Sequence, residues 1–345
     1  MSTTKQTHRR TRRAAGITLT TLVAAAALGG SAALAQSPAA DEPVDIAYLS
    51  FAVTNTYDAP MLAAAQNAAA QANARLQVFD AANDPGAQTT QLQDAVASGQ
   101  FEGIIVQPIF GPGLIPDVQN AITQGIKVAN LDQVLGEDLT TSDAQVDGLA
   151  ANVVFVPSEI GRKLGEQTVA ACAAAAADPC KVGYIYAFQG FPLDTAIETA
   201  FLAAVEGSPV EVVRTGDGYF NALSGLSAAQ DMLQAVPDLN VIVGSDQAIT
   251  GALTAAAGAG VADTIKTVGY GGARVAIQRV ADGGQFATVM QLPATEGRLA
   301  TQQLIDAIRT GTDAEGVDPV AALPDGGVVT QANAADMLAL AEWDG

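Results

Sequence analysis

The sequence predicts an α/β protein with two lobes. Short runs rich in Val and Ile alternate with longer segments rich in Ala, Gln and Leu at helical spacing, which is the pattern of repeated βα units. The strand-like runs are almost continuously apolar, as expected when helices cover both faces of a parallel sheet. About 310 residues follow residue 35, which is more than one hydrophobic core usually holds, so we expect two lobes.

The alternation continues from residue 44 almost to the end of the chain. We expect strands at 44–50, 76–80, 103–107, 126–131, 182–187, 210–214, 240–244, 265–270 and 285–290, with a short strand-like run at 328–330. We expect helices at 59–74, 87–98, 114–124, 158–176, 193–206, 222–235, 247–258, 273–282 and 295–310. Their Ala-rich composition favours helix intrinsically.

Residues 1–35 have the composition of a secretory signal peptide. Basic side chains up to Arg13 precede a run of small and apolar residues from Ile17, which ends in Ala-Leu-Ala. We expect cleavage near Ala35, a periplasmic or secreted product, and no direct membrane insertion after cleavage. The Arg pairs leave both Sec and twin-arginine export open.

The charge balance excludes some partners. Cleavage would remove five of the 16 basic residues and none of the 36 acidic ones, so the remaining chain would carry a formal charge near −25. Such a surface repels phosphate backbones and anionic lipids, so we expect neither nucleic-acid nor membrane-surface binding.

Cysteine and histidine usage limits the chemistry further. Cys172 and Cys180 are the only cysteines, and in an exported chain we expect them to form a disulfide. Two cysteines without histidine are poor metal ligands, and we expect no metal or cofactor. His8 is the only histidine and would leave with the signal peptide, which excludes Ser-His and Cys-His catalysis from the mature chain. We therefore expect no enzyme.

Two polar segments interrupt the βα pattern. The acidic segment 136–148 is either a lobe boundary or a surface loop. The segment 310–327, which contains Pro319, Pro324 and several glycines, is predicted to cross between lobes.

The stretch 44–58 passes from an apolar strand directly into a polar and aromatic loop. Pockets in open α/β sheets form beyond the carboxyl ends of the strands. Phe51, Asn55, Tyr57 and Asp58 occupy that position, where a ring packs on apolar carbons while amide and carboxylate groups bond hydroxyls. The alternative is a strand end followed by a helix cap at Asn55 or Asp58.

Several motifs resemble the ribose-binding-protein-like group of type I periplasmic binding proteins. They are Asn55-Thr56-Tyr57, FEGIIVQP (101–108), GIKVANLD (125–132), PDLNVIVGSDQAITGAL (237–253), VGYGG (268–272) and DGGQFATVMQLPATEG (282–297). The resemblance covers about 44–340. It implies two Rossmann-like lobes joined by three hinge crossovers, with an N-terminal lobe of 43–154 plus 293–318 and a C-terminal lobe of 155–292 plus 319–345.

The resemblance also implies a ligand in the cleft between the lobes. It assigns Phe51, Asn55, Tyr57, Gln107 and Asp132 to the first half of the pocket, and Phe220, Ser245 and Gln291 to the second half and hinge. Asp132 is the main candidate, because a carboxylate can accept hydrogen bonds from two adjacent hydroxyls. Asp58, Gln133, Phe155, Phe191 and Asp194 complete the predicted set, together with Asp246, which either contacts ligand or caps the helix from Gln247.

The chain departs from the group at three positions. Sugar binders of the group have an arginine after the aspartate, another in the first helix of the second lobe, and an aspartate after VGY or VGF. Gln133, Thr195 and Gly271 stand there instead. Asp132 would thereby lose its neighbouring cation, so it should protonate, find another partner, or meet a cationic or hydroxyl-rich ligand. Ordinary pentopyranose recognition is therefore not expected.

The resemblance implies a monomeric solute-binding protein that delivers a sugar, sugar alcohol or related compound to the permease and ATPase of an ABC importer. A sensor component for a chemoreceptor or sensor kinase, or a binder of a cationic or other non-pentose molecule, remains the alternative. An NAD-dependent enzyme is disfavoured because the first strand lacks a Gly-rich phosphate turn. A lactose-repressor-type regulator is disfavoured because no DNA-reading helix pair precedes the core.

Overall fold

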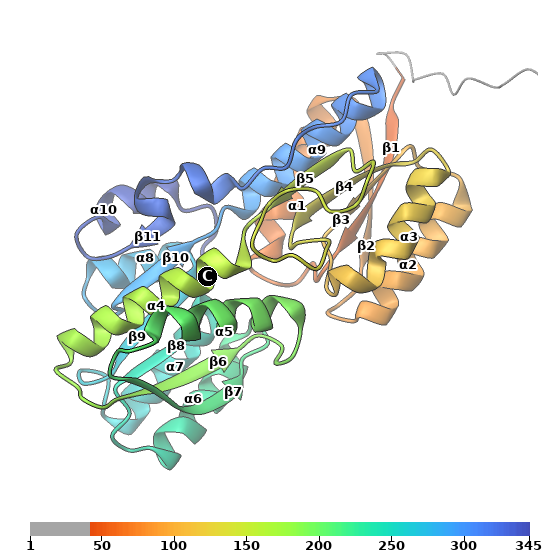
Figure 1. The fold of residues 1–345 in the computed structure, drawn as a ribbon. Helices are drawn as coiled ribbons and strands as arrows, with labels where there is room; N and C mark the ends of the chain where they lie inside the picture. The colour runs from red at the N-terminus through yellow and green to blue at the C-terminus, as the bar shows by residue number, and fades with distance from the viewer. Residues whose placement is uncertain (1–41) are drawn as a thin grey trace, which may run out of the picture. The chain divides into compact units, whose positions relative to one another are not determined.

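The computed structural model describes residues 42–345, so the predicted signal peptide and its cleavage site lie outside the described residues. Two parallel-stranded sheets flanked by helices form the described chain (Figure 1), which confirms the predicted α/β class. Within this part of the chain, no helix is long and apolar enough to cross a membrane.

The first lobe contains five parallel strands in the order β2-β1-β3-β4-β5. Its strands are β1 (Val44–Ser50), β2 (Ala74–Asp80), β3 (Gly103–Val106), β4 (Lys127–Asp132) and β5 (Ala151–Val154). Its helices are α1 (Asp58–Gln71), α2 (Pro85–Ser98), α3 (Gly111–Thr123) and, from later in the chain, α9 (Pro293–Thr310), which packs on α1, β4 and β5.

The second lobe contains six strands in the order β11-β10-β9-β8-β6-β7, of which only β11 is antiparallel to its neighbour. Its strands are β6 (Cys180–Tyr186), β7 (Val210–Asp217), β8 (Val241–Ser245), β9 (Lys266–Gly271), β10 (Ala287–Met290) and β11 (Val328–Val329). Its helices are α4 (Pro157–Ala174), α5 (Pro192–Val205), α6 (Ala222–Ala235), α7 (Asp246–Ala259), α8 (Arg274–Ala281) and α10 (Ala334–Met337).

The chain passes between the lobes three times, as the resemblance implies. It leaves the first sheet after β5, returns between β10 and α9, and leaves again after Val317, which bridges Val153 at the edge of the first sheet. Three connections let two lobes rotate relative to each other while their internal packing stays intact.

The structure corrects three expectations about the elements. Strand β5 and helix α10, each of four residues, were not predicted. The acidic segment 136–148 connects β4 to β5 within one sheet, so the surface-loop interpretation is right and the lobe-boundary one is wrong. Strands β2 and β7 are half-exposed edge strands, so the helices do not cover both faces of every strand.

Close packing of α4 on α5 requires small residues. A Cβ atom at Gly161 would lie 2.1 Å from the carbonyl oxygen of Ile197 and 2.9 Å from the Cβ of Ala200. The disulfide between Cys172 and Cys180, predicted from the sequence, joins the last turn of α4 to the first residue of β6.

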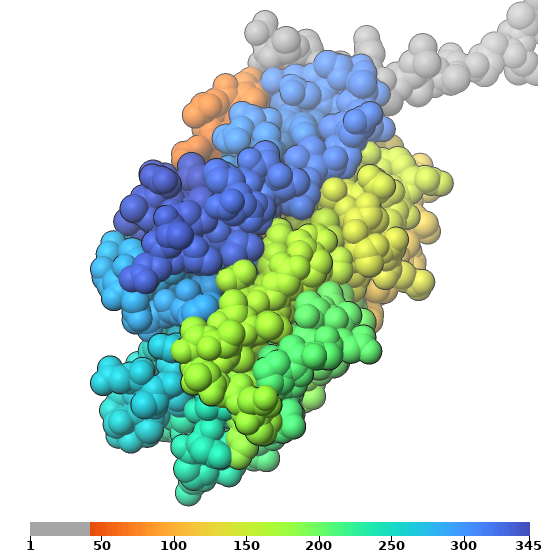
Figure 2. Space-filling model, turned by 60° about the vertical axis from the view of Figure 1, so that its left-hand side comes forward, coloured from red at the N-terminus to blue at the C-terminus, as the bar shows by residue number. Residues whose placement is uncertain are grey.

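The C-terminal segment follows α4 on the face shown in Figure 2, where it appears in dark blue beside the yellow-green helix. The ammonium of Lys163 in α4 donates a hydrogen bond of 2.8 Å to the carbonyl oxygen of Gly326. Near the end of the chain, the indole of Trp343 donates to the carbonyl of Gly271 at 2.8 Å and makes an edge contact with Tyr57 of the first lobe. The last residues therefore connect both lobes.

Candidate functional site

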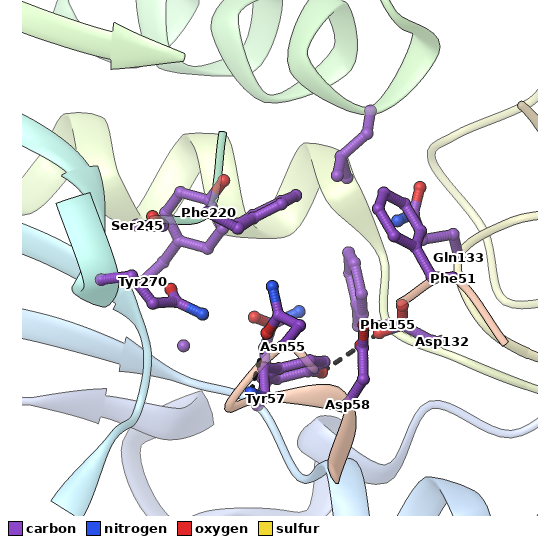
Figure 3. A pocket seen from close by; sticks show the side chains of 14 residues that line it. Phe51, Asn55, Tyr57, Asp58, Asp132, Gln133, Phe155, Phe220, Ser245 and Tyr270 are labelled. Carbon is purple, nitrogen blue, oxygen red and sulfur yellow. Dashed lines mark hydrogen bonds between the residues drawn. The ribbon is translucent and has the colours of Figure 1, made fainter. Parts of the chain in front are cut away.

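A pocket lies where the carboxyl ends of the two parallel sheets meet, and we call it the interlobe cavity. Figure 3 shows Phe51, Asp132, Gln133 and Phe155 on one side of it and Phe220, Ser245 and Tyr270 on the other. Its lining consists of Phe51, Asn55, Tyr57, Asp58, Asp132, Gln133, Phe155, Leu193, Phe220, Ser245, Gln247, Tyr270, Gly271 and Gln291. All of these lie at a strand end or in the loop or helix start that follows, which is where α/β sheets bind ligands.

Buried hydrogen bonds hold two carboxyl groups of the first lobe. The Tyr57 hydroxyl donates to Asp132 Oδ1 at 3.1 Å. The Gln107 amide nitrogen donates to Asp58 Oδ1 at 2.7 Å and to Asp132 Oδ2 at 3.2 Å, while its Oε1 accepts from the Phe51 amide at 3.0 Å. Because Gln107 accepts on one side, its amide orientation is determined and it must donate toward both carboxyls. These neutral partners replace the cation that the sequence lacks.

A third carboxyl group, that of Glu296 in α9, lies beside Asp132 and is fully buried. Neither Glu296 oxygen makes a hydrogen bond within the described residues, and the carboxyl group interacts electrostatically with Asp132. Three carboxyl groups from three elements therefore meet on the first-lobe side of the cavity.

Burial changes the protonation of this cluster. Desolvation raises the pKa of Asp132 to about 6, although the hydrogen bonds from Gln107 and Tyr57 lower it. Desolvation, followed by the negative charge of Asp132, raises the pKa of both Asp58 and Glu296 well above their usual range. At neutral pH, Asp132 is consequently ionised, and its charge opposes the ionisation of Asp58 and Glu296.

The second lobe contributes a hydroxyl, two amides and two aromatic rings. Ser245 ends β8, and its hydroxyl accepts from the Ala248 amide at 3.3 Å while facing the cavity. Gln291 follows β10, and Gln247 lies in the first turn of α7. The Tyr270 hydroxyl is buried without a hydrogen-bond partner among the described residues. This wall can thus exchange several hydrogen bonds with a polar ligand.

Ten of the predicted site residues line the cavity, and four do not. Gln107 lies behind the wall and positions both carboxyls. Phe191 and Asp194 border a smaller adjoining hollow, where Asp194 accepts hydrogen bonds from the amides of Ala187 and Phe188. Asp246 is buried within the second lobe and accepts from Thr288 and the Ala273 amide.

The helix-cap alternatives are wrong for three residues. Asp246 is the first residue of α7, and the Ser245 side chain caps that helix instead. No side chain caps α1, so neither Asn55 nor Asp58 has that role. Asn55 instead accepts from the Tyr57 amide at 2.8 Å and thereby stabilises the turn that presents Tyr57.

Leu193, Gln247, Tyr270 and Gly271 were missed as lining residues, and Glu296 and Trp343 as supporting ones. Gln247 follows a strand end and could have been found from that position. Leu193 and Glu296 lie in the first turns of α5 and α9, which follow β6 and β10, so their positions gave the same signal. Trp343 lies beyond the last helix, where nothing in the local pattern marks it.

The missing aspartate after Val268-Gly269-Tyr270 has a structural reason. Gly271 has φ +127°, a conformation that side chains rarely adopt, and a Cβ there would lie 2.7 Å from Cζ2 of Trp343. The Trp343 ring therefore occupies the space that an aspartate side chain at position 271 would need. The glycine that distinguishes this chain from the sugar binders at that position makes room for the tryptophan.

Aromatic rings from both lobes meet next to the cavity. Phe51 of the first lobe lies 6.0 Å from Phe188 and 6.4 Å from Phe220 of the second, measured between ring centroids. Phe110 of the first lobe lies 6.1 Å from Phe191 of the second. Such contacts stabilise the arrangement in which the lobes touch.

Comparison with known proteins identifies the family. Residues 46–313 match the family described as "Periplasmic binding protein domain". The ribose import binding protein RbsB of Salmonella typhimurium is 26% identical over 304 residues, which cover 88% of this chain and 96% of that protein. RbsB of Bacillus subtilis is 24% identical over 236 residues, covering 67% and 70%.

Solved structures share the fold. An ABC transporter solute-binding protein from Mycobacterium smegmatis, solved with bound glycerol, has a TM-score of 0.74 at 24% identity and covers 88% of this chain and 99% of that one. A galactofuranose-binding protein has a TM-score of 0.74 at 19% identity, covering 86% and 98%. The chain therefore belongs to the periplasmic binding protein domain family, in the ribose-binding-protein-like group that its motifs predict.

Proposed function

We propose that this protein binds a small polyhydroxylated solute, a sugar, sugar alcohol or related compound, in the interlobe cavity and delivers it to an ABC importer. The observation that supports this most strongly is a cavity that takes hydrogen-bonding groups and aromatic rings from both lobes at their strand ends. Relatives described as ribose import binding proteins support the ligand class and the importer as partner.

The lining has the chemistry that a polyol requires. Amides such as Asn55, Gln133 and Gln291 can each donate and accept, and ionised Asp132 accepts from hydroxyls that carry no charge. Aromatic rings pack against the C–H faces of a sugar ring. We propose the residues that line the interlobe cavity as its ligand-binding residues.

Closure is the proposed response to ligand. A ligand that contacts Asp132 in the first lobe and Ser245 in the second can make both contacts only in the closed state. It favours closure by as much as its affinity for the closed state exceeds its affinity for the open state. The closed form would present one surface from both lobes to the permease. No bond is made or broken in this process, so we propose a binding protein without enzymatic activity.

We further propose that export and cleavage near Ala35 deliver the protein to the periplasm or the outside of the cell, where it acts as a monomer. The proposed lobe boundaries after 154, 292 and 318 are where closure would bend the chain, close to the three connections described above.

Calorimetric titration of the mature protein with D-ribose, D-arabinose, D-galactose, myo-inositol and glycerol tests this function. At least one should bind and reduce the radius of gyration in solution scattering. Gln291→Leu should weaken that binding by roughly ten- to a hundredfold, because a buried amide contact is lost, whereas Gln119→Leu on the exposed face of α3 should not. Absence of heat and of compaction with every compound, aminated sugars included, would refute the proposal.

A further inference from the structure

The interlobe cavity contains negative charge without positive charge. Asp58 and Asp132 line it and Glu296 lies behind them, whereas none of its lining residues is lysine, arginine or histidine. The ion pairs of residues 42–345 all use other carboxylates, for example Arg75 with Asp45 and Lys181 with Asp238. The charge at the cavity wall is therefore uncompensated.

Asp132 is the member of this cluster whose charge remains exposed to a ligand. Its hydrogen bonds come from neutral groups, Tyr57 and Gln107, which stabilise a carboxylate but do not neutralise it. A buried carboxylate without a cation is costly, and a cation that enters with the ligand would remove that cost.

The other walls are also suited to a cation. Phe51, Tyr57, Phe155, Phe220 and Tyr270 line the same cavity, and the faces of such rings attract ammonium groups. The buried Tyr270 hydroxyl has no partner among the described residues, so an acceptor remains free in the cavity wall. The aromatic rings and the Tyr270 hydroxyl therefore favour a cationic ligand separately from the carboxyl cluster.

From this combination, we propose that the natural ligand carries a protonated amine as well as hydroxyls, as an amino sugar or amino polyol does, with the ammonium group at Asp132. This rests on the proposed function and narrows its ligand class. The net charge of −20 acts in the same direction, because it attracts cations to the surface and repels sugar acids and sugar phosphates.

Matched pairs of compounds test whether an amine on the ligand strengthens binding. D-glucosamine is compared with D-glucose, and D-galactosamine with D-galactose, by calorimetric titration of the mature protein at pH 7, with the N-acetylated forms as uncharged controls. We expect at least one amine to bind ten times more tightly than both its parent sugar and its acetylated form. If the neutral sugars bind as tightly as the amines or more so, the inference is wrong and the proposed function stands. If neither class binds, the inference is wrong, and the proposed function fails as well only when D-ribose, D-arabinose, myo-inositol and glycerol also do not bind.

Two variants locate the amine. Asp132→Asn should reduce the ratio of amine to parent affinity at least tenfold, while the exposed control Asp231→Asn should leave it unchanged. Gln133→Arg places a cation beside Asp132 and should reduce the same ratio without removing the carboxylate, so it serves even if Asp132→Asn does not fold. A ratio that stays the same in both variants would overturn the assignment to Asp132.

Discussion

Asp132→Asn is expected to make the unliganded protein more stable at pH 7. Burial raises the pKa of Asp132 from its ordinary 3.8 to about 6, which corresponds to about 3 kcal/mol of destabilisation of the ionised form in the folded state. An amide at this position has no charge to desolvate. The gain in the free energy of unfolding should therefore reach up to about 3 kcal/mol.

The gain should depend on pH in a defined direction. Folded Asp132 holds its proton more tightly than unfolded Asp132, so its favourable contribution is complete below pH 4 and is lost as pH rises through about 6. The wild type should lose this stability between about pH 4 and 6, and the variant should not. Asp58, Glu296 and Tyr57 face Asp132 in both proteins. Desolvation raises the pKa of Asp58 and Glu296 in each, whereas the further increase caused by the charge of Asp132 is present only in the wild type.

The site can accept the asparagine. Asp132 has φ +68°, a conformation that Asp and Asn tolerate better than other residues with a Cβ. The asparagine oxygen can accept from Gln107, which must donate, while its nitrogen donates to the Tyr57 oxygen after the hydroxyl has turned. Alanine would lose both contacts and is the poorer test.

Urea denaturation of the unliganded mature protein between pH 4 and 8, followed by circular dichroism, measures the effect. Asp231→Asn removes a charge from an exposed position and should follow the wild type. A variant less stable than wild type at pH 7, or a difference that does not change with pH, would refute the reasoning.

Two further predictions concern packing and the disulfide, and the same denaturation assay tests both. Replacing Cys172 and Cys180 by alanine should lower the free energy of unfolding by roughly 2–3 kcal/mol, because the bridge closes a loop with a sequence separation of 8. Under reducing conditions the wild type loses the bridge, so wild type and variant should then be equally stable. A variant that is still less stable than the reduced wild type would contradict this cause. Gly161→Ala should cost about 1–3 kcal/mol, because its methyl group would meet Ile197. In contrast, Gly258→Ala in α7 has no atom within 4 Å of the new methyl group and should be neutral or stabilising by up to about 1 kcal/mol, so equal losses at both glycines would argue against the packing explanation.

The strand ends are the part of the site that could be read from sequence. Phe51, Asp132 and Ser245 follow or end apolar runs, and parallel strands bring such positions to one edge of each sheet. Leu193 and Glu296 were not predicted, although they lie in the first turns of α5 and α9 after β6 and β10. Their contribution depends on which way these helix starts face, which the sequence pattern does not show.

By itself, the sequence determined the alternating βα pattern, the disulfide and most of the cavity wall that the first lobe contributes. The spacing of apolar residues, the number of cysteines and the residues that follow each strand can all be read directly from the chain. Only the tertiary structure decided how the charge of Asp132 is held. Its partners Tyr57, Gln107 and Glu296 lie 75, 25 and 164 positions away, and only folding brings them together around one buried carboxylate. Burial and hydrogen bonding depend on these distant neighbours, so the protonation of the site is a property of the fold and not of any single stretch of sequence.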